Sequence, residues 1–305
     1  MIPHYDVLVA GAGHGGAQTA IALRQHRFVG TIGLVGEEPE LPYERPPLSK
    51  EYLSGERTFE RLLLRPPSFW TDKQVDTLLG QRIVAVEDRH RTVRLSDGSA
   101  LHYGKLVWAT GGSARRLSCQ GHELAGVYTV RCRKDVDQMR RELGSTDRIV
   151  IIGGGYIGLE VAAVLRKLGK SVTLIEAMDR LLARVAGEPV SRFYEMQHRA
   201  QGVHIVLRGS VVCIEGAGGR VTGVRLADGS VVPAQIVVVG IGILPLVEPL
   251  LAAGADGDNG VAVDEFCRTS LPHVYAVGDC ALHKNAFAGS HRVRLESIQN
   301  ATDMA

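Results

Sequence analysis

The sequence has 305 residues, of which 45% are hydrophobic and 22% are charged, and its formal net charge at pH 7 is +2. This length suggests about two domains, and the composition supplies enough apolar residues for buried sheets. A net charge so close to zero gives no reason to expect a nucleic-acid partner.

The sequence gives no sign of export or of a membrane span. No basic and apolar leader precedes the first predicted strand. The longest apolar stretch, residues 236–247, is shorter than the roughly 20 residues that cross a bilayer and contains Gly240, Gly242 and Pro245. We therefore expect a cytoplasmic protein, monomeric or dimeric, without a membrane partner.

The first predicted elements are a strand, a glycine turn, a helix and a second strand. Residues 5–10 form an apolar run that predicts a strand, and the small residues at 18–23 predict a closely packed helix. Between them lies Gly11-Ala12-Gly13-His14-Gly15-Gly16. A second strand is predicted at 31–35, shortly before Glu37. Further strands are predicted at 83–87, 92–95 and 105–108.

The same order of elements recurs in the second half. A strand at 148–152 leads into Gly153-Gly154-Gly155-Tyr156-Ile157-Gly158, a helix is predicted over 157–168, and a strand at 171–175 precedes Glu176. Short strands are then predicted at 203–207, 210–214, 221–226, 230–232 and 236–239. We interpret the two halves as an internal duplication.

Each glycine turn has the G-x-G-x-x-G spacing, in which the three glycines have separate physical roles. The first allows the tight turn, the second lets the backbone approach a pyrophosphate, and the third lets the helix pack on the strand. In chain order these are Gly11, Gly13 and Gly16, and then Gly153, Gly155 and Gly158. Glu37 and Glu176 stand where a carboxylate hydrogen-bonds an adenosine ribose. The pattern predicts two bound dinucleotides.

The spacing of the cysteines argues against thiol redox chemistry. None of the five forms a CxxC or CxxxxC pair, and none follows the first predicted unit in residues 41–52. We expect structural, reduced thiols, with no zinc site and no iron–sulfur ligands. The five are Cys119, Cys132, Cys213, Cys267 and Cys280.

A resemblance to a known family rests on motifs spread over nearly the whole chain. Leu41-Pro42-Tyr43-Glu44-Arg45-Pro46-Pro47-Leu48-Ser49-Lys50 resembles the signature of the FAD-containing, NADH-dependent ferredoxin and rubredoxin reductases that serve oxygenase systems. The further matches are Ala109-Thr110-Gly111, residues 153–160, Gly240-Ile241-Gly242, residues 274–279 and residues 296–301.

The resemblance implies an α/β fold with two Rossmann-like dinucleotide-binding domains, as in glutathione reductase. Residues 1–113 and 246–305 would form a discontinuous FAD domain, and residues 114–245 an NAD domain inserted in it. Members usually continue into a smaller third domain. Because the sequence stops at Ala305, we expect that interface domain to be absent.

Three residues are implied to act on hydride transfer. Lys50 would place an ammonium near flavin N5, with Glu160 as its ion-pair partner beside the nicotinamide. Tyr156 is similar to the aromatic residue that stacks over the flavin and moves aside for nicotinamide. The alternatives are a surface lysine, a solvated helix glutamate and a tyrosine packed in the core.

Other residues are implied to hold the two cofactors. Asp279 would accept a ribitol hydroxyl, and Ser297 would cap a helix starting at Ile298, whose N-terminus faces the flavin. The expected FAD contacts are Gly11, Gly13, His14, Gly15, Gly16, Glu37, Arg45, Lys50, Ile83, Ala109, Thr110, Gly111, Arg131, Asp279, Glu296, Ser297 and Ile298. The expected NAD contacts are Gly153, Gly155, Tyr156, Ile157, Gly158, Glu160, Glu176, Arg184, Ile241 and Gly242.

The choice between NADH and NADPH depends on residues near the second turn. Glu176 favours NADH, because a carboxylate repels a 2′-phosphate. Arg180 and Arg184 follow the second strand closely enough to reach such a phosphate, or they form an exposed basic helix face. We expect NADH to be preferred.

The expected activity follows from the number of electrons transferred. NADH donates a hydride, which carries two electrons, whereas an iron–sulfur cluster accepts one. FAD provides the intermediary, and without a cysteine pair the electrons must leave for a [2Fe–2S] ferredoxin or a rubredoxin. A local basic rim, with Arg65 as a candidate, would receive such an acidic partner. The alternatives are a flavin disulfide reductase or NADH oxidase, and a redox-dependent binding module similar to apoptosis-inducing factor.

Overall fold

The computed structural model describes residues 2–289 and 291–305, which divide into two compact units. Unit 1 comprises the described residues of Met1–Glu44, Leu63–Ser113 and Leu244–Ala305. Unit 2 comprises Arg45–Leu62 and Ala114–Ile243. The second unit is therefore inserted in the first, and residues 45–62 group with it rather than with the rest of the N-terminal part.

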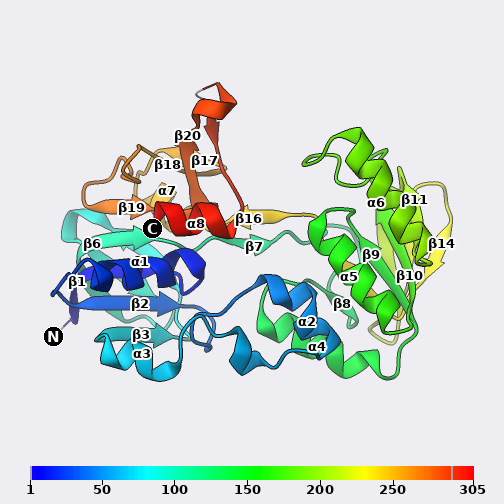
Figure 1. Ribbon diagram of the computed structural model, residues 1–305, viewed down its shortest axis with the longest axis horizontal. Helices are drawn as coiled ribbons and strands as arrows, with labels where there is room; N and C mark the ends of the chain where they lie inside the picture. The colour runs from blue at the N-terminus through cyan, green and yellow to red at the C-terminus, as the bar shows by residue number, and fades with distance from the viewer. Residues whose placement is uncertain (1, 290) are drawn as a thin grey trace. The chain divides into compact units, whose positions relative to one another are not determined.

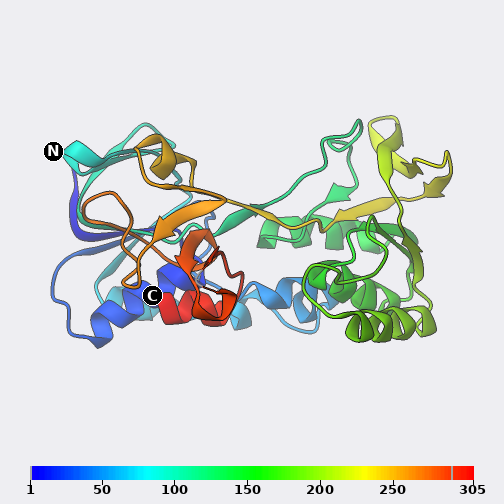
Figure 2. The same ribbon diagram turned by 90° about the horizontal axis from the view of Figure 1, so that it is seen from above.

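Unit 1 is built on a parallel sheet with the strand order of a dinucleotide-binding fold. Strands β3 (Val75–Leu79), β2 (Ile32–Gly36), β1 (His4–Ala10), β6 (Ala100–Trp108) and β19 (Val274–Ala276) are parallel neighbours in that order. Helix α1 (His14–Gln25) packs its Ala17, Ala20 and Ile21 against Val7 and Val9 of β1. Helix α8 (Ile298–Met304) lies beside α1 in both views (Figures 1 and 2).

The other elements of unit 1 extend and cover this sheet. Strands β4 (Ile83–Glu87) and β5 (Thr92–Leu95) continue it in antiparallel fashion from β6. A separate sheet contains β17 (Gly257–Asp258), β18 (Gly260–Val263), β20 (Ala281–Lys284) and β21 (Arg292–Val293). Strands β7 (Gly112–Ala114) and β16 (Ile243–Pro245) form a two-stranded sheet where the chain passes from one unit to the other. The remaining helices are α3 (Pro67–Asp72) and α7 (Glu248–Ala252).

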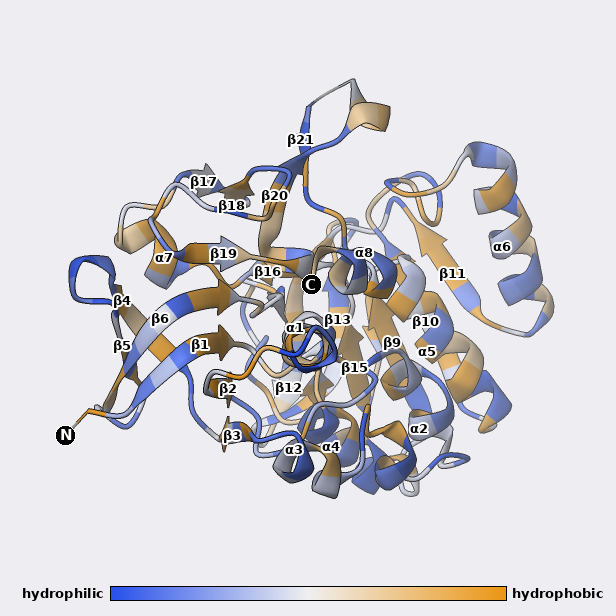
Figure 3. Cartoon of the chain, turned by 60° about the vertical axis from the view of Figure 1, so that its left-hand side comes forward, coloured by the Kyte–Doolittle hydropathy of each residue, from blue (hydrophilic) through white to orange (hydrophobic). Residues whose placement is uncertain are grey.

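Unit 2 repeats the parallel sheet, with strands β11 (His204–Leu207), β10 (Ser171–Glu176), β9 (Arg148–Ile152), β15 (Ile236–Val239) and β8 (Val127–Tyr128) in that order. The central strands β9 and β15 are hydrophobic along most of their length (Figure 3). The helices are α4 (Arg133–Leu143), α5 (Tyr156–Lys167) and α6 (Glu188–Ala200). A three-stranded antiparallel sheet, β12 (Val211–Ala217), β13 (Arg220–Leu226) and β14 (Val231–Pro233), packs on the parallel one.

The α/β class with two Rossmann-like units is confirmed, and the internal duplication is visible with one difference. In unit 1 the strand β6 pairs with both the hairpin and the parallel strands, so the two parts share one sheet. In unit 2 strand β14 ends at Pro233 and β15 starts at Ile236, and the hairpin forms a sheet of its own. Proline lacks a backbone N–H to donate to a sheet ladder and is typical of strand ends.

Residues 45–62 are fastened to unit 2 by polar and aromatic contacts. They contain the 3₁₀ turns η1 (Pro46–Ser49) and η2 (Phe59–Leu62) and the short helix α2 (Glu51–Ser54). Tyr52, which is buried, donates its hydroxyl to Asp137 Oδ1 of α4 at 2.5 Å. Burial and Asp137 together raise the pKa of Tyr52. Arg133 stacks over the Phe59 ring at 4.0 Å.

We predict that Tyr52→Phe lowers the free energy of unfolding by about 1 kcal/mol, because Asp137 loses one donor but keeps its ion pair with Arg133. Urea unfolding measures the change. Tyr194→Phe is the matched control, because Tyr194 is 37% exposed on α6. Equal stability of both variants and the parent would show that this hydrogen bond does not hold the segment.

Among the described residues, no helix is both long enough and apolar enough to cross a membrane.

Candidate dinucleotide sites

The first glycine turn has the geometry that a bound pyrophosphate requires. Gly11 has φ +107°, and a Cβ there would lie 2.4 Å from the carbonyl oxygen of Ala109. A Cβ at Gly16 would lie 1.8 Å from the carbonyl oxygen of Gly11, so only glycine lets α1 approach β1 this closely. At Gly13, by contrast, a Cβ would meet nothing within 4 Å. The turn is closed toward the protein and open at its middle glycine.

The second turn repeats these three environments. Gly153 has φ +110°, and a Cβ there would lie 2.3 Å from the carbonyl oxygen of Gly240. A Cβ at Gly158 would lie 2.0 Å from the carbonyl oxygen of Gly153, and one at Gly155 would meet nothing within 4 Å. Helices α1 and α5 both begin at a glycine N-cap that supplies no side-chain hydrogen bond. Their first-turn N–H groups therefore suit an anionic ligand.

In unit 1 the expected FAD contacts gather around the first turn. Ala109 and Thr110 lie directly against Gly11. A Cβ at Gly278, in the 3₁₀ turn η4 (Gly278–Cys280) that carries Asp279, would lie 3.3 Å from Ala301 of α8. Ser297 caps α8, as predicted, by accepting a hydrogen bond of 3.0 Å from the backbone N–H of Asn300. Three distant stretches of sequence thus meet at one end of the sheet.

The carboxylates expected at the two riboses have different surroundings. The side chain of Glu37 is 61% exposed and lies 3.8 Å from Arg82, next to Ile83 at the buried start of β4. Glu176 accepts backbone hydrogen bonds from Gly154 at 2.6 Å and Met178 at 2.8 Å. In unit 2 the carboxylate therefore also holds the glycine turn in place.

The predicted ion pair between Lys50 and Glu160 is present, with Nζ and Oε1 2.9 Å apart. Both residues belong to unit 2. The other carboxylate oxygen, Oε2, accepts a hydrogen bond of 2.5 Å from Ser49 Oγ. The side chains of the pair are 39% and 31% exposed, so the pair contributes at most about 1 kcal/mol to stability. Because Lys50 contacts one carboxylate oxygen and Ser49 the other, the two residues together orient the Glu160 side chain.

The remaining expected residues of unit 2 surround the second turn and the segment 45–62. Tyr156 is 55% exposed and Ile157 40% exposed, so Tyr156 is not packed in the core. Arg45 donates from Nη1 to the backbone oxygen of Arg131 at 2.7 Å. Ile241 and Gly242 follow β15, and a Cβ at Gly153 would lie 3.4 Å from Ile241 Cγ2.

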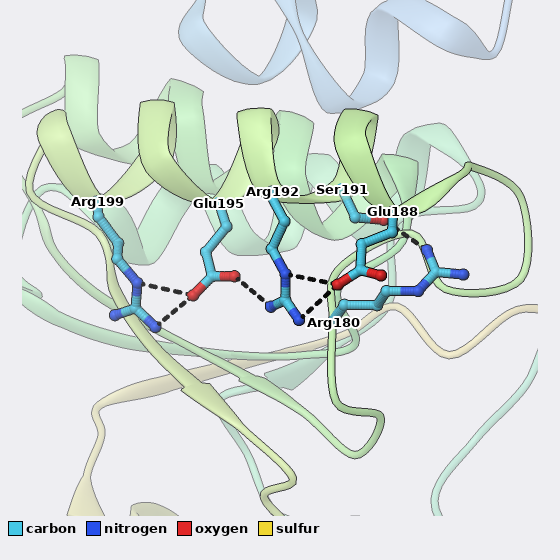
Figure 4. Close-up of polar contacts among 6 residues, drawn as sticks. All are labelled: Arg180, Glu188, Ser191, Arg192, Glu195 and Arg199. Atoms are coloured by element: carbon cyan, nitrogen blue, oxygen red, sulfur yellow. Dashed lines mark hydrogen bonds and ion pairs between the residues drawn. The ribbon is translucent and has the colours of Figure 1, made fainter.

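The two arginines beyond Glu176 differ in what they contact. Arg180 donates to the carbonyl oxygens of Ala183 and Ala186 and to Ser191 Oγ of α6, and these contacts tie the preceding loop to the helix. Figure 4 shows this contact beside a ladder of ion pairs along α6, formed by Glu188, Arg192, Glu195 and Arg199. Arg184 is exposed, and a Cβ at Gly242 would lie 3.9 Å from its Nη2.

Two polar residues that the sequence did not single out are buried or largely buried at these sites. Ser49 is 4% exposed and bonds Glu160. Arg294, whose side chain is 10% exposed, forms an ion pair with Glu296 and donates to the backbone oxygen of Asp279. Ser49 could have been singled out from the sequence because it stands next to Lys50. No local sequence feature identifies Arg294, because its contact with Asp279 forms only in the folded chain.

Comparison with known proteins assigns the family. Residues 5–305 match the family described as pyridine nucleotide-disulphide oxidoreductase. The chain belongs to this family. It is 59% identical over 303 residues to a ferredoxin–NAD(P)(+) reductase of Sphingomonas sp, covering 99% of this chain and 73% of that protein. It is 57% identical to the ferredoxin reductase subunit of a 5,5'-dehydrodivanillate O-demethylase of Sphingobium sp., covering 100% of this chain and 74% of that protein.

A solved structure agrees with this assignment. The chain matches a covalent putidaredoxin reductase–putidaredoxin complex with a TM-score of 0.94 and 40% identity, covering 99% of this chain and 73% of that one. Membership of the pyridine nucleotide-disulphide oxidoreductase family implies FAD and NAD(P)H as cofactors. The two open glycine turns fit two such dinucleotides.

The cysteines of this family member are not arranged for disulphide chemistry. All five are free thiols in the structure. Burial raises the pKa of Cys280, Cys267 and Cys119, which is opposite to the shift that activates a redox thiolate. Within residues 2–289 and 291–305, no group of three or more His, Cys, Asp or Glu side chains is placed to hold a metal ion.

Alanine should affect different properties at the open glycine, Gly13, and at the tightly packed glycine, Gly16. Gly13→Ala should change the stability of the FAD-free protein by no more than about 1 kcal/mol and weaken FAD binding about tenfold or more, because the methyl group enters the open side of the turn. Gly16→Ala should cost about 3 kcal/mol, because its methyl group collides with the Gly11 carbonyl. Thermal unfolding and flavin-fluorescence titration separate the two effects. A Gly13→Ala protein with unchanged FAD affinity would contradict the assignment of this turn.

Proposed function

We propose that the chain is the NADH-dependent, FAD-containing ferredoxin reductase of an oxygenase system. The observation that carries the proposal is a pair of open glycine turns in a chain 59% identical to a ferredoxin–NAD(P)(+) reductase. The solved complex of putidaredoxin reductase with putidaredoxin, 40% identical here, supports direct transfer to an iron–sulfur protein. The thiols give electrons no route through a disulphide within the chain.

The first turn holds FAD and the second holds the pyridine nucleotide. When bound, FAD supplies chemistry that takes a hydride from NADH and releases electrons singly to a ferredoxin or rubredoxin. Unit 1 contributes the Gly11–Gly16 turn, the Ala109-Thr110-Gly111 segment, Asp279 and the N-terminus of α8. These groups hold the pyrophosphate and the ribitol and present helix-dipole charge where negative charge develops.

The residues proposed to act on the hydride belong to one unit. Ser49 and Lys50 fix both oxygens of Glu160, so the carboxylate has one orientation before the nucleotide binds. Tyr156 starts α5 with 55% of its surface exposed, which leaves the ring free to move when nicotinamide enters. This arrangement positions reactants rather than supplying a proton.

NADH is preferred over NADPH for two reasons. Glu176 is held by two backbone N–H groups near the second turn, where its charge would repel a 2′-phosphate. Arg180 already donates to two carbonyl oxygens and a serine hydroxyl, so a phosphate would have to displace these contacts. Arg184 lies by Gly242 and suits a pyrophosphate charge at the glycine turn.

The acceptor is proposed to be an acidic [2Fe–2S] ferredoxin or a rubredoxin that docks on a local basic rim. Arg65 belongs to this rim. Its guanidinium lies 5.7 Å from the ring centroid of Phe69 in the following helix, which holds the charge at the surface of unit 1.

We predict that anaerobic mixing of the FAD-loaded protein with NADH bleaches the flavin absorbance, and that adding a [2Fe–2S] ferredoxin with cytochrome c then restores it. NADPH should give a kcat/KM at least about tenfold lower, because of the repulsion at Glu176. Stopped-flow absorbance measures both steps. Flavin reduction without any ferredoxin reduction would refute the proposed acceptor, and equal rates with both nucleotides would refute the role of Glu176.

We predict that Glu160→Ala slows flavin reduction by NADH about ten- to a hundredfold while FAD stays bound, because Lys50 and the nicotinamide lose their common partner. Ser49→Ala should slow it less, since Lys50 still holds one carboxylate oxygen. Glu188→Ala is the control, because this glutamate is 66% exposed on α6. Unchanged reduction kinetics in Glu160→Ala would remove Glu160 from the site.

A further inference from the structure

Arg294 is a largely buried charge whose partners come from two parts of unit 1. Its side chain is 10% exposed, and Nη2 lies 2.7 Å from Glu296 Oε1. Nη1 donates to the backbone oxygen of Asp279 at 2.9 Å. Nε is buried and has no hydrogen-bond partner among the described residues. Burying a guanidinium costs free energy unless its N–H groups are paired. The two Nη atoms of Arg294 are paired, and the unpaired Nε adds a desolvation cost.

The backbone beside Arg294 is shaped to admit its side chain. Gly260, the first residue of β18, has φ +136°, and a Cβ there would lie 3.1 Å from Arg294 Cδ. The same Cβ would lie 3.0 Å from the backbone oxygen of Cys280. Gly260 therefore leaves room for the arginine stem next to the turn that carries Asp279. Arg294 is therefore positioned by the packing of its Cδ against Gly260 as well as by the contacts of its two Nη atoms.

The two partners of Arg294 belong to different elements of unit 1. The carbonyl of Asp279 is part of η4, which follows β19, whereas Glu296 immediately precedes Ser297, the N-cap of α8. The two elements also pack directly on each other, with Gly278 facing Ala301. Arg294 adds to this packing a link through two charge-assisted contacts, one to each side.

We propose that Arg294 is a positioning residue that locks the Asp279 turn to the N-terminus of α8, so that the two present themselves to FAD in one fixed arrangement. The inference rests on the proposed function, in which both elements contact FAD. Arg294 itself acts through Asp279 and Glu296. Its loss removes the charged link between the turn and the helix start and leaves both elements, and their packing contact, in place.

The test compares Arg294→Met with Arg292→Met, an exposed arginine two residues earlier on β21. FAD dissociation constants come from fluorescence titration of the FAD-free protein, and far-UV circular dichroism gives the folded fraction. We expect Arg294→Met to weaken FAD binding about tenfold or more, the loss of one charge-assisted hydrogen bond, with the fold retained. Arg292→Met should bind like the parent. Equal FAD affinity in the folded Arg294→Met protein would overturn the inference.

Arg294→Lys keeps the charge but replaces the rigid, forked guanidinium, whose Nη1 and Nη2 contact separate partners, with a single ammonium nitrogen. It should weaken FAD binding to an intermediate degree and alter the visible circular dichroism of bound flavin, a signature that a purely structural role would not move. This variant decides the matter if Arg294→Met does not fold, since an affinity and spectrum equal to those of the parent would refute the proposal. A parent protein that binds no FAD would instead refute the proposed function.

Discussion

The contact between each cofactor helix and its strand is the constraint on which both sites depend. In unit 1 the Cα of Gly16 sits on the carbonyl of Gly11, and in unit 2 Gly158 sits on Gly153, with no space for a single methyl group. This contact brings the N-terminus of the helix to the carboxyl end of the strand, where its free N–H groups converge. The other residues named at each site, such as Ala109 and Thr110 in unit 1 and Ile241 in unit 2, lie beside this glycine contact.

The regular elements could be predicted where the local pattern was strong, and the long-range contacts could not. Strands β4, β5, β9 and β15 have the predicted bounds, because each is a short β-rich or apolar run between turn residues. Strand β3 and helix α6 were missed. Helix α6 carries Val190, Phe193 and Met196 at a spacing of three residues, but these side chains are 48%, 54% and 57% exposed, and Ser191 is the residue of the helix that is buried. Lys50 could be predicted from the local motif at residues 41–50. The importance of Arg294 could not, because its contact with Asp279 exists only in the folded chain.

The two units share one order of strands, glycine turn and helix but differ in the contacts around the turn. Unit 1 keeps Glu37 largely exposed, whereas unit 2 uses Glu176 to bond the backbone of its own glycine turn. The hairpin shares the main sheet in unit 1 but forms a separate sheet in unit 2, where β14 ends at Pro233. A similar sequence pattern therefore predicts the same cofactor type without predicting the same hydrogen bonds around it.

Residues 45–62 belong to unit 2, and so do both residues of the ion pair proposed to act on hydride transfer. Lys50 reaches Glu160 at 2.9 Å from a segment that Tyr52 and Phe59 fasten to α4. All of these residues belong to one compact unit, so the contacts that form the ion pair lie within that unit. Ser49 and Lys50 thus orient the Glu160 carboxylate without any contribution from a nucleotide. In the role proposed for Glu160, such preorganisation would lower the barrier without using binding energy to build the site during the reaction.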